Sequence, residues 1–206
     1  MTLVKMCGLH RLQDIDYINE VGPDMAGMVL SPGFRRTVPI RVARTMAARL
    51  NHNISSVGVF VDRPVDEVSD IARFLDLDVI QLHGVESGAY IVELQETLDL
   101  PVIKSFGTSR DQLEMAMVSP ADFILIDPGC GSGNTFDLSL LDGLERNVII
   151  AGGLTPDNVA DAIRRAHPFG VDTSSGIETD GSKDRKKMIR FISAVRAEDA
   201  QLEEKK

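Results

Sequence analysis

The chain has 206 residues, of which 43% are hydrophobic and 26% are charged, with a formal net charge of -9. This mixture is typical of a globular protein, and the acidic excess disfavours nucleic acid and anionic membrane as partners because both require basic patches. Two cysteines, Cys7 and Cys130, are too few for a disulfide framework and match no zinc spacing. Since the sequence has neither a signal peptide nor an apolar run of membrane-spanning length, we expect a cytoplasmic protein.

Short apolar runs recur along the whole chain, and most of them are apolar on both faces and rich in β-branched residues. That pattern is typical of strands buried in a parallel sheet. In chain order the runs are LVKMC from Leu3, MAGMVL from Met25, SVGVFV from Ser56, DVIQL from Asp78, PVIKSF from Pro101, DFILID from Asp122, NVIIAG from Asn147 and FGVDTS from Phe169.

Amphipathic stretches lie between these runs. Apolar residues three and four positions apart predict helices over residues 65–75, 91–98 and 159–166, each with one apolar face. The stretch from Arg110 to Met117 predicts a weaker helix, and the stretch around Leu138 to Leu144 a short one. Pro39, Pro64 and Pro156 fall near expected helix starts, where a missing N–H costs nothing.

Repeated strand–helix units predict an α/β fold. Eight units favour closure into a single (β/α)₈ barrel over an open doubly wound sheet, which usually has five or six strands. No linker or change of composition divides the chain, so we expect one domain over residues 1–206. The charged tail from Ala197 to Lys206 is expected to be a frayed, solvated helix end.

Unusual residues collect where the strands end, which is the face of such a barrel that carries the active site. Gly152 and Gly153 follow the seventh strand, and Ser174, Ser175 and Gly176 follow the eighth. These two loops can make tight turns only, or they can form a phosphate cradle of backbone N–H groups at the start of a short helix. The position of both loops favours the cradle.

Candidate groups for acid–base chemistry lie at two other strand ends. Cys7 closes the first strand and is either a small buried hydrophobe or a thiolate that removes a proton from carbon. Asp127 closes the sixth strand and either caps the glycine-rich loop after it or serves as a general acid. Lys5 is a candidate substrate ligand, and its charge would favour the thiolate of Cys7.

Two further candidates lie at the mouth of the expected barrel. Arg36 is either a surface arginine or a clamp that binds a carboxylate through two hydrogen bonds, and the adjacent Arg35 is its alternative. His83, after the fourth strand, is either a structural loop residue or a substrate ligand. Cys130 is expected to have no role.

Taken together, these motifs resemble the phosphoribosylanthranilate isomerase family over nearly the whole chain and in the same order. They are KMCG at residues 5–8, RRTV at 35–38, GVFV at 58–61, QLHG at 81–84, DPGCGSGNTFD at 127–137, AGGLTPDNV at 151–159 and GVDTSSGIE…GSKD at 170–184. Two departures are Leu138, where the family usually has Trp, and the loop SPGFRR, which lacks the usual residue order.

The resemblance implies an Amadori rearrangement of N-(5-phosphoribosyl)anthranilate in tryptophan synthesis. Cys7 would be the base, Asp127 the acid and Arg36 the ligand of the anthranilate carboxylate, while the loops after strands seven and eight would hold the phosphate. No metal or redox cofactor is implied, and the protein is expected to be a monomer or a homodimer. The alternatives are a histidine-pathway phosphoribosyl isomerase, which resembles an Asp-based design at the position of Cys7, and a non-catalytic phosphosugar-binding barrel.

Overall fold

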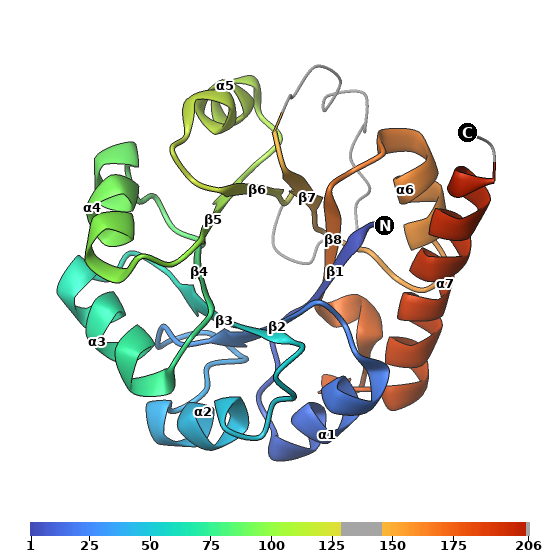
Figure 1. The fold of residues 1–206 in the computed structure, drawn as a ribbon, viewed down its shortest axis with the longest axis horizontal. Coiled ribbons are helices and arrows are strands. Elements are labelled where there is room, and N and C mark those ends of the chain that lie inside the picture. The colour runs from blue at the N-terminus through green and yellow to red at the C-terminus, as the bar shows by residue number, and fades with distance from the viewer. Residues whose placement is uncertain (129–145, 205–206) are drawn as a thin grey trace.

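The computed structural model describes residues 1–128 and 146–204. Eight parallel strands pair in chain order and close into a barrel, because the first strand also pairs with the eighth (Figure 1). The strands are β1 (Leu3–Met6), β2 (Met25–Val29), β3 (Ser55–Phe60), β4 (Val79–Leu82), β5 (Val102–Phe106), β6 (Phe123–Ile126), β7 (Val148–Ile150) and β8 (Gly170–Thr173). The predicted barrel is therefore confirmed, and the open sheet is excluded.

Helices form a ring around the barrel (Figure 1). They are α1 (Leu12–Val21), α2 (Ile40–Ala47), α3 (Val65–Leu75), α4 (Gly88–Leu98), α5 (Arg110–Val118), α6 (Val159–Ala166) and α7 (Arg185–Glu203). Pro39 and Pro64 lie at the N-caps of α2 and α3, and Ser87 and Ser109 cap α4 and α5 by accepting hydrogen bonds from backbone N–H groups of the first turn. The short helix expected around residues 138–144 lies outside the described residues.

The apolar core has two parts because each strand is buried on both faces. A large cluster fills the space between the barrel and the helices. A smaller cluster fills the inside of the barrel with Met25, Val57, Val79, Ile103, Leu125, Ile149 and Ala151. The interior turns polar toward the C-terminal ends of the strands, where Lys5, Gln81 and Asp172 are buried. The barrel is therefore a packed core with a polar floor at one end, which is the end that carries the site.

A two-stranded antiparallel hairpin follows the barrel. The 3₁₀ helix η2 (Ser175–Ile177) leaves β8, and the short strands β9 (Glu178–Thr179) and β10 (Ser182–Lys183) lead from it into α7. The turn between them contains Asp180 and Gly181, both with positive φ. This hairpin brings Glu178 and Lys183 beside each other as register partners.

The C-terminal helix differs from the frayed end expected after Ala197. It continues to Glu203 and buries the carboxylates of Glu198 and Asp199. Arg164 of α6 donates two hydrogen bonds to Glu198, and Asp199 accepts hydrogen bonds from the backbone N and the hydroxyl of Thr2. Two of the charges that suggested a solvated tail, Glu198 and Asp199, are therefore partners of distant groups and hold the helix against the barrel, whereas Glu203 and Glu204 are exposed.

Asp199→Ala is expected to lower the free energy of unfolding by roughly 2–3 kcal/mol, because it leaves the buried donors of Thr2 without their charged acceptor. Urea unfolding at neutral pH measures the loss. Asp16→Ala removes an exposed aspartate from α1 and should stay within about 0.5 kcal/mol of the parent protein. Equal effects of the two substitutions would show that the contact between the first and last elements contributes nothing specific.

Candidate active site

A cavity of about 490 Å³ opens at the C-terminal ends of the strands. Nearly all of the residues singled out from the sequence line it, although they are far apart in the chain. Those that line it are Cys7, Arg35, Arg36, His83, Asp127, Gly152, Gly153, Ser174, Ser175 and Gly176. The cavity is also lined by Gln81, Asp172 and Phe34. Lys104 of β5 is buried but does not line the cavity, and it pairs with Glu86. The strand-end positions thus converge on one cavity.

Cys7 lies at the floor of the cavity and is almost fully buried. Its backbone N donates to Thr173 O at 2.8 Å, which fixes the end of β1 against β8. Gly27 on the neighbouring β2 makes room for the thiol, since a Cβ at that position would lie 2.8 Å from Cys7 Sγ. The sulfur therefore lies in a space that any residue larger than glycine at position 27 would occupy.

Lys5 is placed differently from the expectation that it contacts the substrate. Its side chain has no exposed surface, it is not among the residues lining the cavity, and its Nζ donates to Asp172 Oδ1 at 2.8 Å. Burial alone would lower the pKa of Lys5, but the negative charges of Asp172 and Cys7 raise it overall. Lys5 is therefore a buried ammonium that interacts with Cys7 and lies outside the cavity lining.

The side chains of Asp127 and His83 both line the cavity and lie next to each other. His83 Nε2 lies 4.0 Å from Asp127 Oδ2, and His83 Nδ1 lies 3.2 Å from Gln81 Nε2. Burial lowers the pKa of His83, and the charge of Asp127 opposes that shift only in part. Burial thus favours the neutral imidazole, whose Nδ1 faces the Gln81 amide and whose Nε2 faces Asp127.

Glycines shape the loops after β7 and β8. Gly152 and Gly153 both have positive φ, and a Cβ on Gly152 would lie 2.5 Å from the ring of Pro128. A Cβ on Gly176 would lie 1.9 Å from Leu154 O. The hydroxyl of Thr173 donates to that same carbonyl at 2.8 Å and joins the two loops. Together these loops form one compact wall of exposed backbone.

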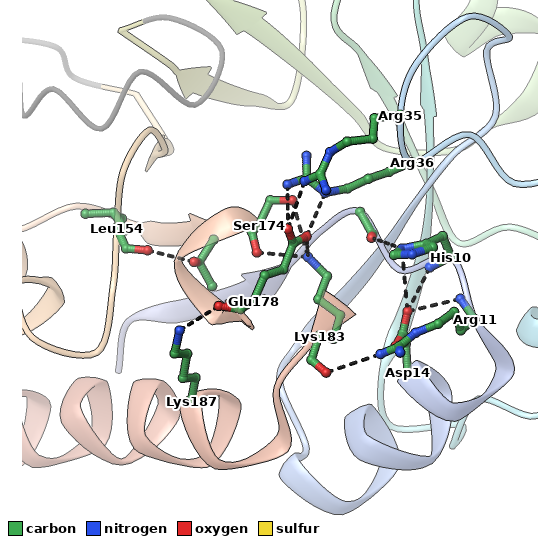
Figure 2. Close-up of polar contacts among 12 residues, drawn as sticks. His10, Arg11, Asp14, Arg35, Arg36, Leu154, Ser174, Glu178, Lys183 and Lys187 are labelled. Atoms are coloured by element: carbon green, nitrogen blue, oxygen red, sulfur yellow. Dashed lines mark hydrogen bonds and ion pairs between the residues drawn. The ribbon is translucent and has the colours of Figure 1, made fainter. Parts of the chain in front are cut away.

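Both loop arginines line the cavity and meet the same carboxylate, that of Glu178 (Figure 2). Arg36 donates from Nε and Nη2 to the two oxygens of Glu178 at 2.7 and 2.9 Å, whereas Arg35 donates once, from Nη2. Arg36 is thus held in a two-bond clamp, and Arg35, whose side chain is 60% exposed, is the peripheral partner.

Sequence reasoning did not single out Asp172, Glu178 or Lys183. Lys183 is buried and donates to Glu178 Oε1 at 2.9 Å and to Ser174 O at 2.9 Å (Figure 2). Burial alone would raise the pKa of Glu178, but hydrogen bonds from Arg36 and Lys183 lower it to about 2. All three residues lie within the segment GVDTSSGIE…GSKD, which pointed to the region but not to these contacts.

Gly8 has a positive φ, and a Cβ there would lie 2.5 Å from Arg36 Cδ and 2.7 Å from Ser174 Oγ. Gly22 has the same kind of backbone, but a Cβ there would meet nothing within 4 Å. Gly22→Ala should therefore cost only the left-handed strain, roughly 1–2 kcal/mol. Gly8→Ala should cost at least about 1 kcal/mol more, because it also displaces Arg36 and Ser174. Urea unfolding of the two variants measures this difference, and equal losses would mean that Arg36 does not rest on Gly8.

Within residues 1–128 and 146–204, no helix has the length and apolar character needed to cross a membrane.

Residues 4–194 match the family model for N-(5'-phosphoribosyl)anthranilate (PRA) isomerase. The N-(5'-phosphoribosyl)anthranilate isomerases of Lacticaseibacillus casei and Acetivibrio thermocellus are 40% and 39% identical, and the matches cover 95% and 97% of this chain and 96% and 98% of theirs.

Among solved structures, phosphoribosyl anthranilate isomerase from Thermotoga maritima superposes with a TM-score of 0.89 at 34% identity, over 96% of this chain and 100% of that one. A complex of this kind of enzyme with reduced 1-(o-carboxyphenylamino)-1-deoxyribulose 5-phosphate gives a TM-score of 0.86 at 34% identity, with the same coverage. The family model and the relatives agree over almost the full length, and the chain belongs to the phosphoribosylanthranilate isomerase family.

Proposed function

We propose that the barrel converts N-(5-phosphoribosyl)anthranilate into 1-(2-carboxyphenylamino)-1-deoxy-D-ribulose 5-phosphate, the isomerisation step of tryptophan synthesis. The observation that carries this proposal is the arrangement of one cavity. A cysteine and an aspartate line it, and so do an arginine clamp and a glycine-rich backbone wall. That arrangement matches a substrate with a reacting sugar between a carboxylate and a phosphate.

Asp127 is the proposed acid. Opening of the furanose requires a proton on the ring oxygen, and the C1–O bond then breaks to leave a Schiff base between C1 and the anthranilate nitrogen. A carboxylic acid at the cavity wall can supply that proton. Burial lowers the pKa of His83 and so favours an uncharged imidazole next to this group.

Cys7 is the proposed base. The Schiff base withdraws electrons from C1, so the thiolate can take the proton from C2, and the electrons of that C–H bond form the C1–C2 double bond of an enolamine. Transfer of a proton to C1, together with loss of the proton from the C2 hydroxyl to the carboxylate of Asp127, then gives the C2 ketone and restores the acid. Positive charge near a cysteine favours its thiolate, and the buried ammonium groups of Lys5 and Lys183 both interact with Cys7. Every step moves protons within the substrate or between it and these two groups, so the scheme uses no redox partner.

The two anionic ends of the substrate are assigned to two different groups of residues in the cavity wall. Arg36 binds the anthranilate carboxylate, because a guanidinium edge matches a carboxylate with two parallel hydrogen bonds. The loops containing Gly152, Gly153 and Ser174–Gly176 bind the phosphate through backbone N–H groups. A net charge of -9 on the whole chain makes these local groups necessary for an anionic substrate.

The histidine-pathway rearrangement uses a larger substrate with two phosphates and is the second candidate. Among the described residues, only the β7–β8 side of the cavity has paired glycines with positive φ. After β3 and β4, the backbone N–H groups of Val85 and Gly84 already donate to the carboxylates of Asp62 and Glu86. This difference between the two sides favours the substrate with one phosphate.

Freshly prepared phosphoribosylanthranilate should be turned over, and the histidine-pathway substrate should not. Cys7→Ala should lower kcat by roughly 10²–10⁴, the range for loss of a positioned acid or base, and Asp127→Asn should give a loss of similar size. Both are measured by product fluorescence or absorbance, together with urea unfolding to show that each variant is folded. A folded Cys7→Ala variant with the parent kcat would remove Cys7 from the mechanism, whereas no turnover by the parent protein would reject the proposed reaction.

Inorganic phosphate at millimolar concentration should inhibit competitively, because it occupies the backbone cradle that binds the phosphate end of the substrate. Initial rates at several substrate concentrations measure the inhibition, with sodium chloride at the same ionic strength as the control for screening. Inhibition of equal size by chloride, or a phosphate effect on kcat alone, would contradict the assignment of the cradle.

A further inference from the structure

The guanidinium of Arg36 has two edges that can each hold a carboxylate. The side edge, Nε and Nη2, is taken by Glu178 at 2.7 and 2.9 Å. The end edge consists of Nη1 and the second hydrogen of Nη2, and within the described part of the chain Nη1 donates no hydrogen bond to another residue. Since Arg36 lines the cavity, one edge is held by the protein while the other remains for a ligand.

Glu178 is itself fixed from several directions. Its side chain is only 6% exposed, and it accepts hydrogen bonds from Arg35 and Lys183 in addition to those from Arg36 (Figure 2). Its backbone carbonyl accepts from Lys187 Nζ at 2.6 Å, so the base of the hairpin is fastened to α7. A carboxylate held in this way can impose one orientation on the guanidinium that it binds.

The same cluster reaches the loop assigned to the phosphate. Lys183 donates to Glu178 Oε1 and to the backbone carbonyl of Ser174, both at 2.9 Å. The carbonyl of Lys183 accepts from Arg11, so the strand that carries this lysine is also tied to the start of α1. Arg36 and Ser174, which both lie against Gly8, are therefore also joined through the buried ion pair of Glu178 and Lys183.

We propose that Glu178 is a positioning residue that grips the side edge of Arg36 so that the end edge meets the substrate carboxylate, while Lys183 ties this clamp to the phosphate-binding loop. This proposal rests on the function proposed above, because it concerns the same cavity and the same substrate. Arg35 gives the cluster a further positive charge at the rim. Arg35, Arg36 and Lys183 surround the single carboxylate of Glu178, so this cluster carries the net positive charge that an anionic substrate requires.

The opposite role for Glu178 would be competition, in which its carboxylate occupies Arg36 and must be displaced by the substrate. The geometry favours positioning because the two edges of the guanidinium are separate, and Glu178 retains Lys183 and Arg35 as partners in either case. The two roles predict opposite changes in KM when the negative charge of Glu178 is removed, so the sign of that change decides between them.

Glu178→Gln replaces one acceptor oxygen with an N–H donor that faces the cations. We expect KM for phosphoribosylanthranilate to rise roughly tenfold or more, because Arg36 loses its fixed orientation, while kcat changes by less than about threefold since the carboxylate contact is made equally before and during the reaction. Steady-state kinetics measure both constants. Glu114→Gln, the same substitution in an exposed pair with Arg110 on α5, is the matched control and should leave KM unchanged.

A double-mutant cycle separates positioning from a general structural effect. In an Arg36→Ala background, Glu178→Gln should raise KM by less than about twofold, because the group that it orients is gone. A rise of the same size in both backgrounds, or a fall in KM in the single variant, would overturn the proposal.

Glu178→Asp retains the charge for Lys183 and Arg35 but shortens its reach toward Arg36, so it tests the same point if the glutamine variant does not fold. It should unfold like the parent protein and show a raised KM, and a KM equal to that of the parent would overturn the proposal. If the parent protein does not turn over the substrate, the proposed function fails. If the parent turns it over and Arg36→Ala raises KM, but the cycle is additive, only the role of Glu178 fails.

Discussion

The cavity depends on one electrostatic constraint, which is that an acidic protein must hold an anionic ligand with very few positive groups. The chain concentrates Arg35, Arg36 and Lys183 around Glu178 at one side of the barrel mouth, and Lys5 beneath its floor. Each buried cation is paired with a carboxylate, since an unpaired buried charge would cost several kcal/mol. The buried carboxylates of Glu178 and Asp172 therefore make it possible to keep lysines and an arginine next to a low-dielectric site.

The barrel supplies the frame for these pairs because side chains alternate between its interior and its helical coat. Register pairs Lys5 of β1 with Asp172 of β8, so the ion pair forms between neighbouring strands without help from a loop. Two residues further, directly after β1, the same alternation points Cys7 into the cavity. The position of the proposed base is thus set by rigid strands, whereas the proposed ligands for the two ends of the substrate lie on loops.

The fold and most of the cavity lining could be predicted from the sequence because both depend on local patterns. Each strand is a short apolar run. The polar or reactive residues that follow the strands all lie at the C-terminal face of the barrel once it closes. The burial of Lys5 could not be predicted, because the side chain of this inward-facing lysine is directed by Asp172, which is 167 residues away. Glu178 was missed for the same reason, since its clamp on Arg36 spans 142 residues. The charged C-terminal tail could not be recognised as docked, because its partner Thr2 lies at the other end of the chain.

The contact between Thr2 and Asp199 has a consequence for biosynthesis of the chain. β1 pairs with β2 on one side and with β8 on the other, so the last strand of the barrel to be synthesised is also the one that covers the open edge of the first. Until residues 170–199 leave the ribosome, a nascent sheet has two unpaired strand edges, which are templates for association with other chains. The hydrogen bonds of Asp199 to residue 2, which join positions 197 residues apart, can form only after that edge is covered. The C-terminal helix is thus fastened next to the seam that β8 closes, and a chain that ended before residue 170 would form a sheet with an uncovered edge rather than a barrel.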